Sequence, residues 1–323
     1  MRYNINSFPK NLFEFNRMFN TEEACWQYLR DVRWPDGVVD YRDGKTLPLG
    51  FVSTRKVWDF PKNFQQSVTA GTVMHQTHLP LRYWFTAAYL MATLKPGVSA
   101  LQLSQQLGLR LETTYMLLMK LRAGLVNPFR TKLRGTIEVD ETYVGAKLSG
   151  KRGRGAGNKS IVIGAIEVID TSDQMVGGRI RMRKIGSVSS GNPHKFITDN
   201  VERGSTIVTD GFRGYLGIEK RGYTHRIIEA EDSEAVAKKL QLIHIVFGNL
   251  KAFLNGTYHV VSSKHLQTYL NEYVFRFNRR KLVFEAFNTL LGIGTIREAP
   301  TYYQLYHTAE LQGWIHPNPK VSQ

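Results

Sequence analysis

The segment that follows Arg134 constrains the fold most, because its apolar and β-branched residues are spaced as in strands rather than as in one long helix. It predicts three consecutive strands and then two strands that alternate with a helix: strands 136–144, 160–168, 178–185, 206–209 and 224–228, with the helix at 193–201. Further helices are predicted over 235–254 and 262–278. This order is typical of an α/β domain with a mixed sheet.

Two aspartates are predicted to lie where such a sheet binds a cation. Alternation along the first strand places Glu138 and Asp140 on one face and apolar residues on the other. The fourth strand ends at Asp210, at the carboxyl edge where open α/β sheets bind ligands. If the two strands are neighbours, Asp140 and Asp210 converge on hard cations such as Mg²⁺ or Mn²⁺, and a pair of such ions supports chemistry at phosphorus. A capping or turn role without metal is the alternative for each aspartate.

A pair of short helices is predicted upstream of the strands. Ser99 is placed to cap the first helix and Gly108 to end it, and a second helix follows at once. Two helices joined by a short glycine-containing turn are typical of a helix-turn-helix. Four residues near the start of the second helix would then face the major groove of DNA: Arg110, Thr113, Thr114 and Tyr115. A helical hairpin that does not bind DNA is the alternative.

The length of the chain predicts more than one domain. We expect an N-terminal region over residues 1–77, a helical DNA-binding region over 78–130, an α/β domain over 131–300 and a C-terminal tail over 301–323. The N-terminal region combines a short helix over 22–30 with aromatic-rich strand-like pieces around 51–58.

The charge of the chain predicts a polyanionic partner. Lys and Arg number 43 against 27 Asp and Glu, which gives a net charge of +16. Release of counterions from phosphates favours nucleic acid, and no basic amphipathic segment suggests a membrane surface. No apolar run is long enough to span a bilayer and the N-terminus lacks the apolar core of a signal peptide, so an intracellular protein is expected.

Short motifs in a fixed order extend over nearly the whole chain. They include EVDETYVG at 138–145 and TDGFRGY at 209–215, together with segments 22–26, 33–37, 70–75, 79–85, 249–251, 256–259 and 269–280. The chain thereby resembles insertion-sequence transposases of the DDE superfamily, in the ISXO-like group related to Merlin elements.

The resemblance implies a ribonuclease-H-like core in which Asp140 and Asp210 hold two Mg²⁺ or Mn²⁺ ions and a third residue comes from a later helix. It also implies that Lys251 contacts DNA phosphate near the scissile bond. The implied protein is a transposase that binds the terminal inverted repeats of an insertion sequence, cuts the DNA and joins the ends to target DNA.

Synapsis of two double-stranded DNA ends implies at least a homodimer, and the expected location is the bacterial cytoplasm, in association with the nucleoid. Two alternatives stay open. One is a nuclease that cuts without joining, and the other is a catalytically inactive, transposase-derived DNA-binding protein.

The third active-site position departs from the family pattern. Related elements place a glutamate one helical stretch before a lysine, and seven residues before Lys251 stands His244, two turns away on the same helix face. Imidazole suits Mg²⁺ poorly, whereas Asn249 offers an amide oxygen from another side of the helix. Position favours His244, and Asn249 stays a candidate because some members of the group are described by an asparagine there.

Three acids near these motifs are interpreted mainly as structural. Glu138 and Glu141 are expected to support the site rather than to bind metal. Glu272 is a weaker candidate for the third ligand, because a salt bridge on a helix surface explains it as well.

A basic, glycine-rich loop follows the first strand and carries Lys147, Lys151, Arg152 and Arg154. It is predicted to hold DNA phosphates beside the catalytic centre, and a solvated hairpin tip is the alternative.

Cysteine pairs of a zinc ribbon, common in relatives, are absent. The single Cys25 excludes a thiolate zinc ribbon and any intrachain disulfide, so no zinc is expected. Cys25 itself is interpreted as a small apolar residue of a helix.

Overall fold

The computed structural model describes residues 8–35, 37–39, 46–47, 50–52, 57–60, 64–127, 129–145, 159–189, 191–228, 240–259 and 261–295. The chain forms two compact units, Met1–Pro128 with Lys281–Gln323, and Phe129–Arg280. The predicted tail at 301–323 lies outside the described residues. No helix in the described ranges combines the length and the apolar character that a membrane span requires.

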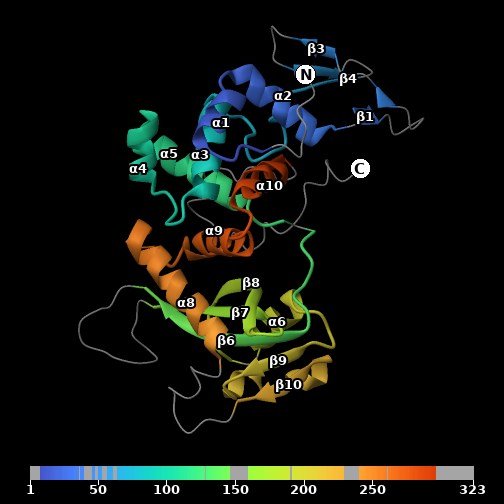
Figure 1. Cartoon of the computed structure of the whole chain (residues 1–323), viewed down its shortest axis with the longest axis vertical. Coiled ribbons are helices and arrows are strands. Elements are labelled where there is room, and N and C mark those ends of the chain that lie inside the picture. The colour runs from blue at the N-terminus through green and yellow to red at the C-terminus, as the bar shows by residue number, and fades with distance from the viewer. Residues whose placement is uncertain are drawn as a thin grey trace. The chain divides into compact units, whose positions relative to one another are not determined.

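The second unit is built on a five-stranded mixed sheet (Figure 1). Its strands are β6 (Thr136–Val144), β7 (Ser160–Asp170), β8 (Met175–Ile185), β9 (Thr206–Thr209) and β10 (Thr224–Ile227), in the order β10-β9-β6-β7-β8. The pairs β6–β7 and β7–β8 are antiparallel, whereas β9 is parallel to β6 and to β10. The predicted mixed α/β architecture is confirmed, with each strand within a few residues of its expected position.

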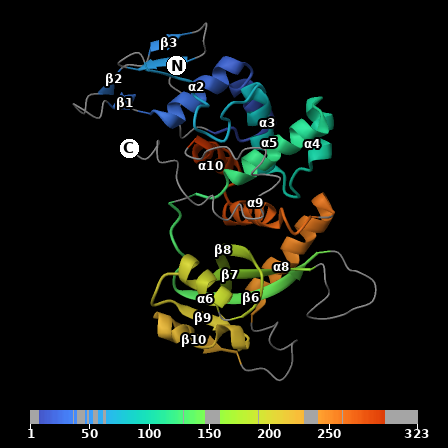
Figure 2. The same ribbon diagram turned by 180° about the vertical axis from the view of Figure 1, so that it is seen from behind.

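Helices cover both faces of this sheet, because alternate residues of each strand are apolar on both sides. Helices α8 (Gln241–Phe253) and α9 (Leu266–Asn278) pack on one face, where Val208 and Ile180 contribute to the core. Helix α6 (Gly191–Asn200) and the 3₁₀ turns η2 (Arg213–Tyr215) and η3 (Ile218–Arg221) pack on the other, with Ile137 and Val139. In Figure 1, α8 lies in front of the sheet. Figure 2 shows the opposite side, where α6 lies in front.

Two side chains of α9 form hydrogen bonds with the outer edge of β8. Asn278 accepts from the Ile180 amide at 2.8 Å and donates to the Ile180 carbonyl at 3.2 Å, as a neighbouring strand would. Gln267 accepts from the Lys184 amide at 2.9 Å and donates to the Met182 carbonyl at 3.4 Å. These bonds occupy backbone groups that an edge strand otherwise leaves open to pairing with another chain.

The first unit is mainly helical. Its helices are α1 (Leu12–Met18), α2 (Glu22–Arg33), α3 (Leu81–Thr93), α4 (Ala100–Leu107), α5 (Leu111–Ala123) and α10 (Val283–Thr295). An aromatic cluster forms its core: Phe15, Phe19, Tyr28, Phe85, Tyr89 and Phe287. Cys25 is buried in α2, where burial raises the pKa of its thiol, as expected of an apolar core residue.

The chain crosses back into the first unit after α9. Helix α10 packs against α2 and α3, whereas the sequence assigned residues up to 300 to the α/β domain. Its partners precede it by more than 180 residues, so no local pattern indicates where it packs.

Two short sheets complete the first unit. Strands β1 (Val38–Val39) and β2 (Thr46–Leu47) form one pair, and β3 (Gly50–Val52), β4 (Val57–Phe60) and β5 (Phe64–Gln66) form an antiparallel sheet.

The predicted helical pair is confirmed in α4 and α5. The Ser99 side chain accepts from the Gln102 amide at 3.1 Å, which caps α4. Gly108 ends α4 with a φ of 64°, a left-handed conformation that glycine adopts without steric cost.

The β8 edge gives a test of the fold. Asn278→Ala removes both bonds to Ile180, so we expect a loss of about 1–3 kcal/mol in local stability and faster amide exchange in β8. Hydrogen exchange measured by mass spectrometry checks this, with the exposed Asn249→Ala of α8 as the matched control. Unchanged exchange in β8 would show that the edge does not depend on Asn278.

Candidate active site

Asp140 lies in the middle of the sheet, on the face that α8 covers. Thr136 pairs with Thr206 and Glu138 with Val208, and the same register continued by two residues brings Asp140 opposite Asp210. Asp140 is only 9% exposed, and its Oδ1 accepts from the Glu141 amide at 2.8 Å. Asp140 thus lies on β6, and Asp210 directly follows β9, the parallel neighbour of β6.

Asp210 opens a tight turn directly after β9. Its Oδ1 accepts from the Phe212 amide at 3.0 Å, and Gly211 takes a φ of 77°. A Cβ at Gly211 would lie 2.7 Å from Ile227, so both the backbone conformation and the space require glycine here. The turn leaves the Asp210 carboxylate partly exposed at the carboxyl edge of the sheet.

Helix α8 brings His244 to Asp140. The distance from His244 Nε2 to Asp140 Oδ2 is 3.5 Å. The ring is partly exposed, yet Nε2 itself is buried and makes no hydrogen bond with any residue that the structure describes. Burial and the charge of Lys251 lower the pKa of His244, while Asp210 raises it, so the neutral imidazole is favoured.

The two glutamates that flank Asp140 have partners on opposite faces of β6. Glu138 is 5% exposed, and its Oε2 accepts from the Ile243 amide in the first turn of α8 at 2.8 Å. Burial raises the pKa of Glu138, although amide donors from Ile243 and Leu242 oppose the increase. Glu141 Oε2 accepts from the hydroxyl of Tyr215 in η2 at 2.8 Å. The expectation that both glutamates are structural agrees with these contacts.

Tyr215 is a buried residue whose hydroxyl donates to Glu141. Burial raises the pKa of its hydroxyl well above the usual value, and the charges of Glu141, Asp140 and Asp210 raise it further. The negative charges of these acids therefore disfavour ionisation of the Tyr215 hydroxyl.

The remaining candidate site residues on α8 and α9 differ in their exposure and in their partners. Lys251 is exposed and lies two turns after His244, close enough to influence its pKa. Asn249 is exposed and lies roughly 140° around the helix from His244. Glu272 is fully buried rather than on the helix surface, although an ion pair within the helix is present as expected. Its Oε1 accepts from the Tyr258 hydroxyl at 3.0 Å and lies 3.8 Å from Arg276.

The predicted DNA-reading residues of α5 differ in exposure. Arg110 and Thr113 are exposed and Tyr115 is partly buried. Thr114 is fully buried, and its hydroxyl donates to the Arg110 carbonyl at 3.1 Å. A side chain placed in this way cannot reach a base, so we leave Thr114 out of the DNA-reading set. The predicted basic loop with Lys147, Lys151, Arg152 and Arg154 lies outside the described residues.

Some of the side chains at this site are suitable ligands for a divalent cation. Carboxylate oxygens are the usual ligands of Mg²⁺ and Mn²⁺, and the orphaned ring nitrogen of His244 beside Asp140 is a further donor. Within the described ranges, no three His, Cys, Asp or Glu side chains converge closely enough to enclose a metal ion. An open arrangement of this kind fits Mg²⁺, which usually keeps several waters and binds one or two carboxylates together with substrate phosphates.

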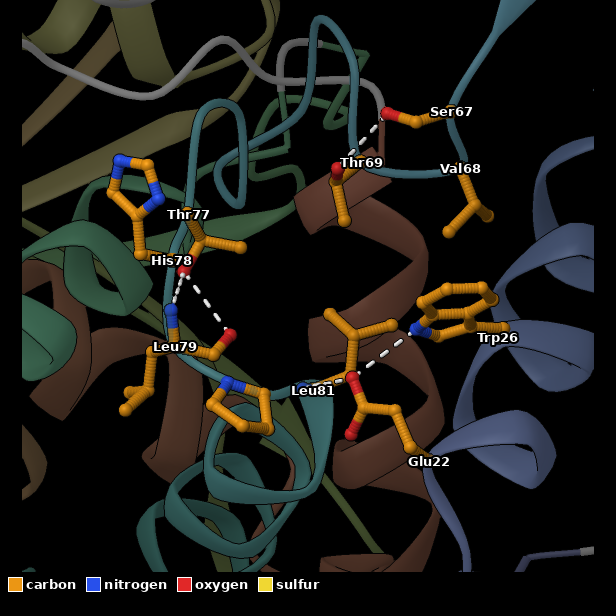
Figure 3. Close-up of a pocket in the computed structure, with 10 residues that line it drawn as sticks. Glu22, Trp26, Ser67, Val68, Thr69, Thr77, His78, Leu79 and Leu81 are labelled. Atoms are coloured by element: carbon orange, nitrogen blue, oxygen red, sulfur yellow. Dashed lines mark hydrogen bonds between the residues drawn. The ribbon is translucent and has the colours of Figure 1, made fainter. Parts of the chain in front are cut away.

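A pocket of about 310 Å³ lies in the first unit, between α2 and the segments 67–69 and 77–81 (Figure 3). Its polar groups bond one another: Glu22 accepts from Trp26 Nε1 at 3.1 Å and from the Leu81 amide at 2.6 Å, and Thr77 Oγ1 accepts from the Leu79 amide at 3.1 Å. These groups hold the start of α3, and we assign the pocket no ligand.

Comparisons with known proteins agree with the motifs. Residues 132–278 match the ISXO2-like transposase domain. An uncharacterized protein in transposable element ISH50 of Halobacterium salinarum is 25% identical over 235 residues, which cover 68% of this chain and 78% of that protein.

Among solved structures, a chain of the simian T-cell lymphotropic virus intasome in complex with PP2A regulatory subunit B56 gamma is similar at 12% identity and a TM-score of 0.28. The match covers 57% of this chain and 66% of that chain, just under two thirds. A TM-score this low does not indicate a shared fold. The domain match is independent of this structure: residues 132–278 match the ISXO2-like transposase domain, which agrees with the resemblance inferred from the motifs.

Proposed function

We propose that the protein is a transposase whose α/β unit is a ribonuclease-H-like domain that cuts and joins DNA. The observation that carries the proposal is that Asp140 lies beside the orphaned Nε2 of His244, on a strand whose parallel neighbour is followed directly by Asp210. The strand order, with three antiparallel strands and two parallel ones added beside the first, supports the same fold. The transposase domain match over these strands supports the function.

Asp140, Asp210 and His244 are the residues that would hold Mg²⁺ or Mn²⁺. A divalent ion bound there supplies Lewis-acid stabilisation of the charge that develops on phosphate oxygens. The pKa of His244 is lowered by burial and by the charge of Lys251, and its neutral form is the one that can bind a metal ion. Lys251 places a positive charge on the same side of α8 as His244, where it would contact a DNA phosphate.

The reaction has two phosphoryl-transfer steps. Water attacks phosphorus at the element end, which breaks the bond to the 3′ oxygen and leaves a 3′-hydroxyl and a 5′-phosphate. The freed 3′-hydroxyl then attacks phosphorus in target DNA and displaces another 3′ oxygen, so the number of phosphodiester bonds is conserved in the joining step.

Recognition of the terminal inverted repeats is assigned to the helical region. Arg110 and Thr113 are exposed at the start of α5, and Tyr115 is partly exposed beside them. The basic loop with Lys147, Lys151, Arg152 and Arg154 follows β6 in sequence, and we assign it to phosphate contacts. Synapsis of two ends requires at least a dimer.

The two aspartates test the enzymatic proposal. Asp140→Asn and Asp210→Asn keep the size of the side chain but remove its charge, so we expect each to lower cleavage of the element's ends by a factor of about 10³ or more, with little effect on DNA binding. Cleavage in Mg²⁺ and gel-shift assays on the same ends measure both properties. Full cleavage by either variant would refute the proposal, and a wild-type protein that binds but never cleaves would identify a DNA-binding derivative.

The identity of the third active-site residue is tested by substituting His244. His244→Ala should lower cleavage by about two orders of magnitude, whereas His244→Glu restores a carboxylate donor and should retain activity in Mg²⁺. Asn249→Ala is the matched variant on the other side of α8. Loss of activity in Asn249→Ala together with wild-type activity in His244→Ala would assign the position to Asn249 instead.

Lys251 is tested through the salt dependence of DNA binding. Removing one phosphate contact lowers the slope of log K against log salt concentration by about 1, so Lys251→Ala should bind the ends more weakly and with a shallower slope. Fluorescence anisotropy over a range of salt concentrations measures both, with the exposed Lys220→Ala as control. A slope equal to that of the wild type would mean that Lys251 makes no phosphate contact.

A further inference from the structure

The two glutamates beside Asp140 are tied to the elements that carry the other site residues. Both are on β6, but their side chains point to opposite faces of the sheet, because Glu138 contacts α8 and Glu141 contacts η2. Each carboxylate has one oxygen bonded to a group far away in the sequence, at a distance of 2.8 Å. Neither bond belongs to the sheet itself.

Glu138 supplies the cap that α8 lacks. The residue before α8 is Leu240, whose side chain makes no capping bond, so the first amides of the helix need an acceptor from elsewhere. Glu138 provides one, since it accepts from Ile243, and His244 is the next residue along the helix. The bond therefore fixes how far along β6 the first turn of α8 lies, and with it the position of His244 relative to Asp140.

Glu141 does the same for the turn that carries Asp210. Tyr215 ends η2 and is fully buried, and its amide donates to the Phe212 carbonyl at 3.0 Å. Phe212 in turn donates to Asp210. The segment from Asp210 to Tyr215 is thus internally bonded, and the hydroxyl of Tyr215 attaches it to β6 through Glu141.

We propose that Glu138 and Glu141 are positioning residues that hold, from the two faces of β6, the helix carrying His244 and the turn carrying Asp210 against Asp140. The proposal rests on the function proposed above. It explains why acids flank Asp140 although neither lies free to bind a cation. Their role is met by any side chain that accepts a hydrogen bond at the same place, which distinguishes them from a metal ligand, whose negative charge is essential.

The test for Glu138 compares Glu138→Ala with Glu138→Gln. Alanine leaves the first amides of α8 without an acceptor, so we expect faster hydrogen exchange there and a fall of about 10²-fold in kcat for end cleavage, with KM for DNA unchanged. Glutamine keeps an oxygen acceptor and should restore both properties to within a few-fold of the wild type. The exposed Glu202→Ala is the control, and circular dichroism shows whether each variant is folded.

Three results decide the role of Glu138. Wild-type exchange and kcat in Glu138→Ala, with Asp140→Asn inactive, would overturn the positioning role alone. A Glu138→Gln protein that is folded but as inactive as Asp140→Asn would also overturn it, because charge rather than hydrogen bonding would then be required. Cleavage by Asp140→Asn, in contrast, would remove the proposed function itself.

Glu141 is tested with a double-mutant cycle. Glu141→Ala and Tyr215→Phe each break the same bond, so each should lower kcat by a similar factor and the double variant should be no worse than either. Glu141→Gln should again be active. Effects that multiply in the double variant would show that the two residues act independently and would overturn this half of the proposal.

Discussion

The parallel pairing of β6 with β9 is the constraint on which the candidate site depends. A shift of one residue in this register would turn either Asp140 or Asp210 to the other face of the sheet, since strand side chains alternate. The register is held by burial on both faces, with Ile137 and Ile207 in one core and Val208 in the other. Packing thus specifies the relation between the two aspartates before any cation is present.

The start of helix α8 is capped by the carboxylate of Glu138, because the residue before the helix makes no capping bond. Glu138 reaches across from the sheet to cap it, and the same device recurs in the first unit, where Glu22 accepts from the Leu81 and Arg82 amides at the start of α3. Burial disfavours the charged form of Glu138, and the amide donors at the start of α8 offset part of that cost. Such long-range caps set the relative positions of elements more firmly than a local cap does, because they join residues far apart in the chain.

Local patterns predict the parts of this structure that depend on neighbouring residues. Alternation along β6 and β9 predicts both strands, and Ser99 and Gly108 predict the ends of α4. The pattern does not predict which residue of α5 turns inward, and so it missed the burial of Thr114. It also missed the burial of Glu272 and the docking of α10, because each depends on partners brought together only by the tertiary fold.

The central proposal is that Asp140 and Asp210 bind divalent cation together with DNA phosphate, with His244 Nε2 beside Asp140 as a further donor. Electron spin-echo envelope modulation of Mn²⁺ bound to the full chain with a DNA end tests it most directly. The account predicts nitrogen modulation from one imidazole that disappears in His244→Gln, and loss of the bound Mn²⁺ when both aspartates are replaced. Nitrogen modulation that persists in His244→Gln, or Mn²⁺ that binds equally well without the aspartates, would contradict it.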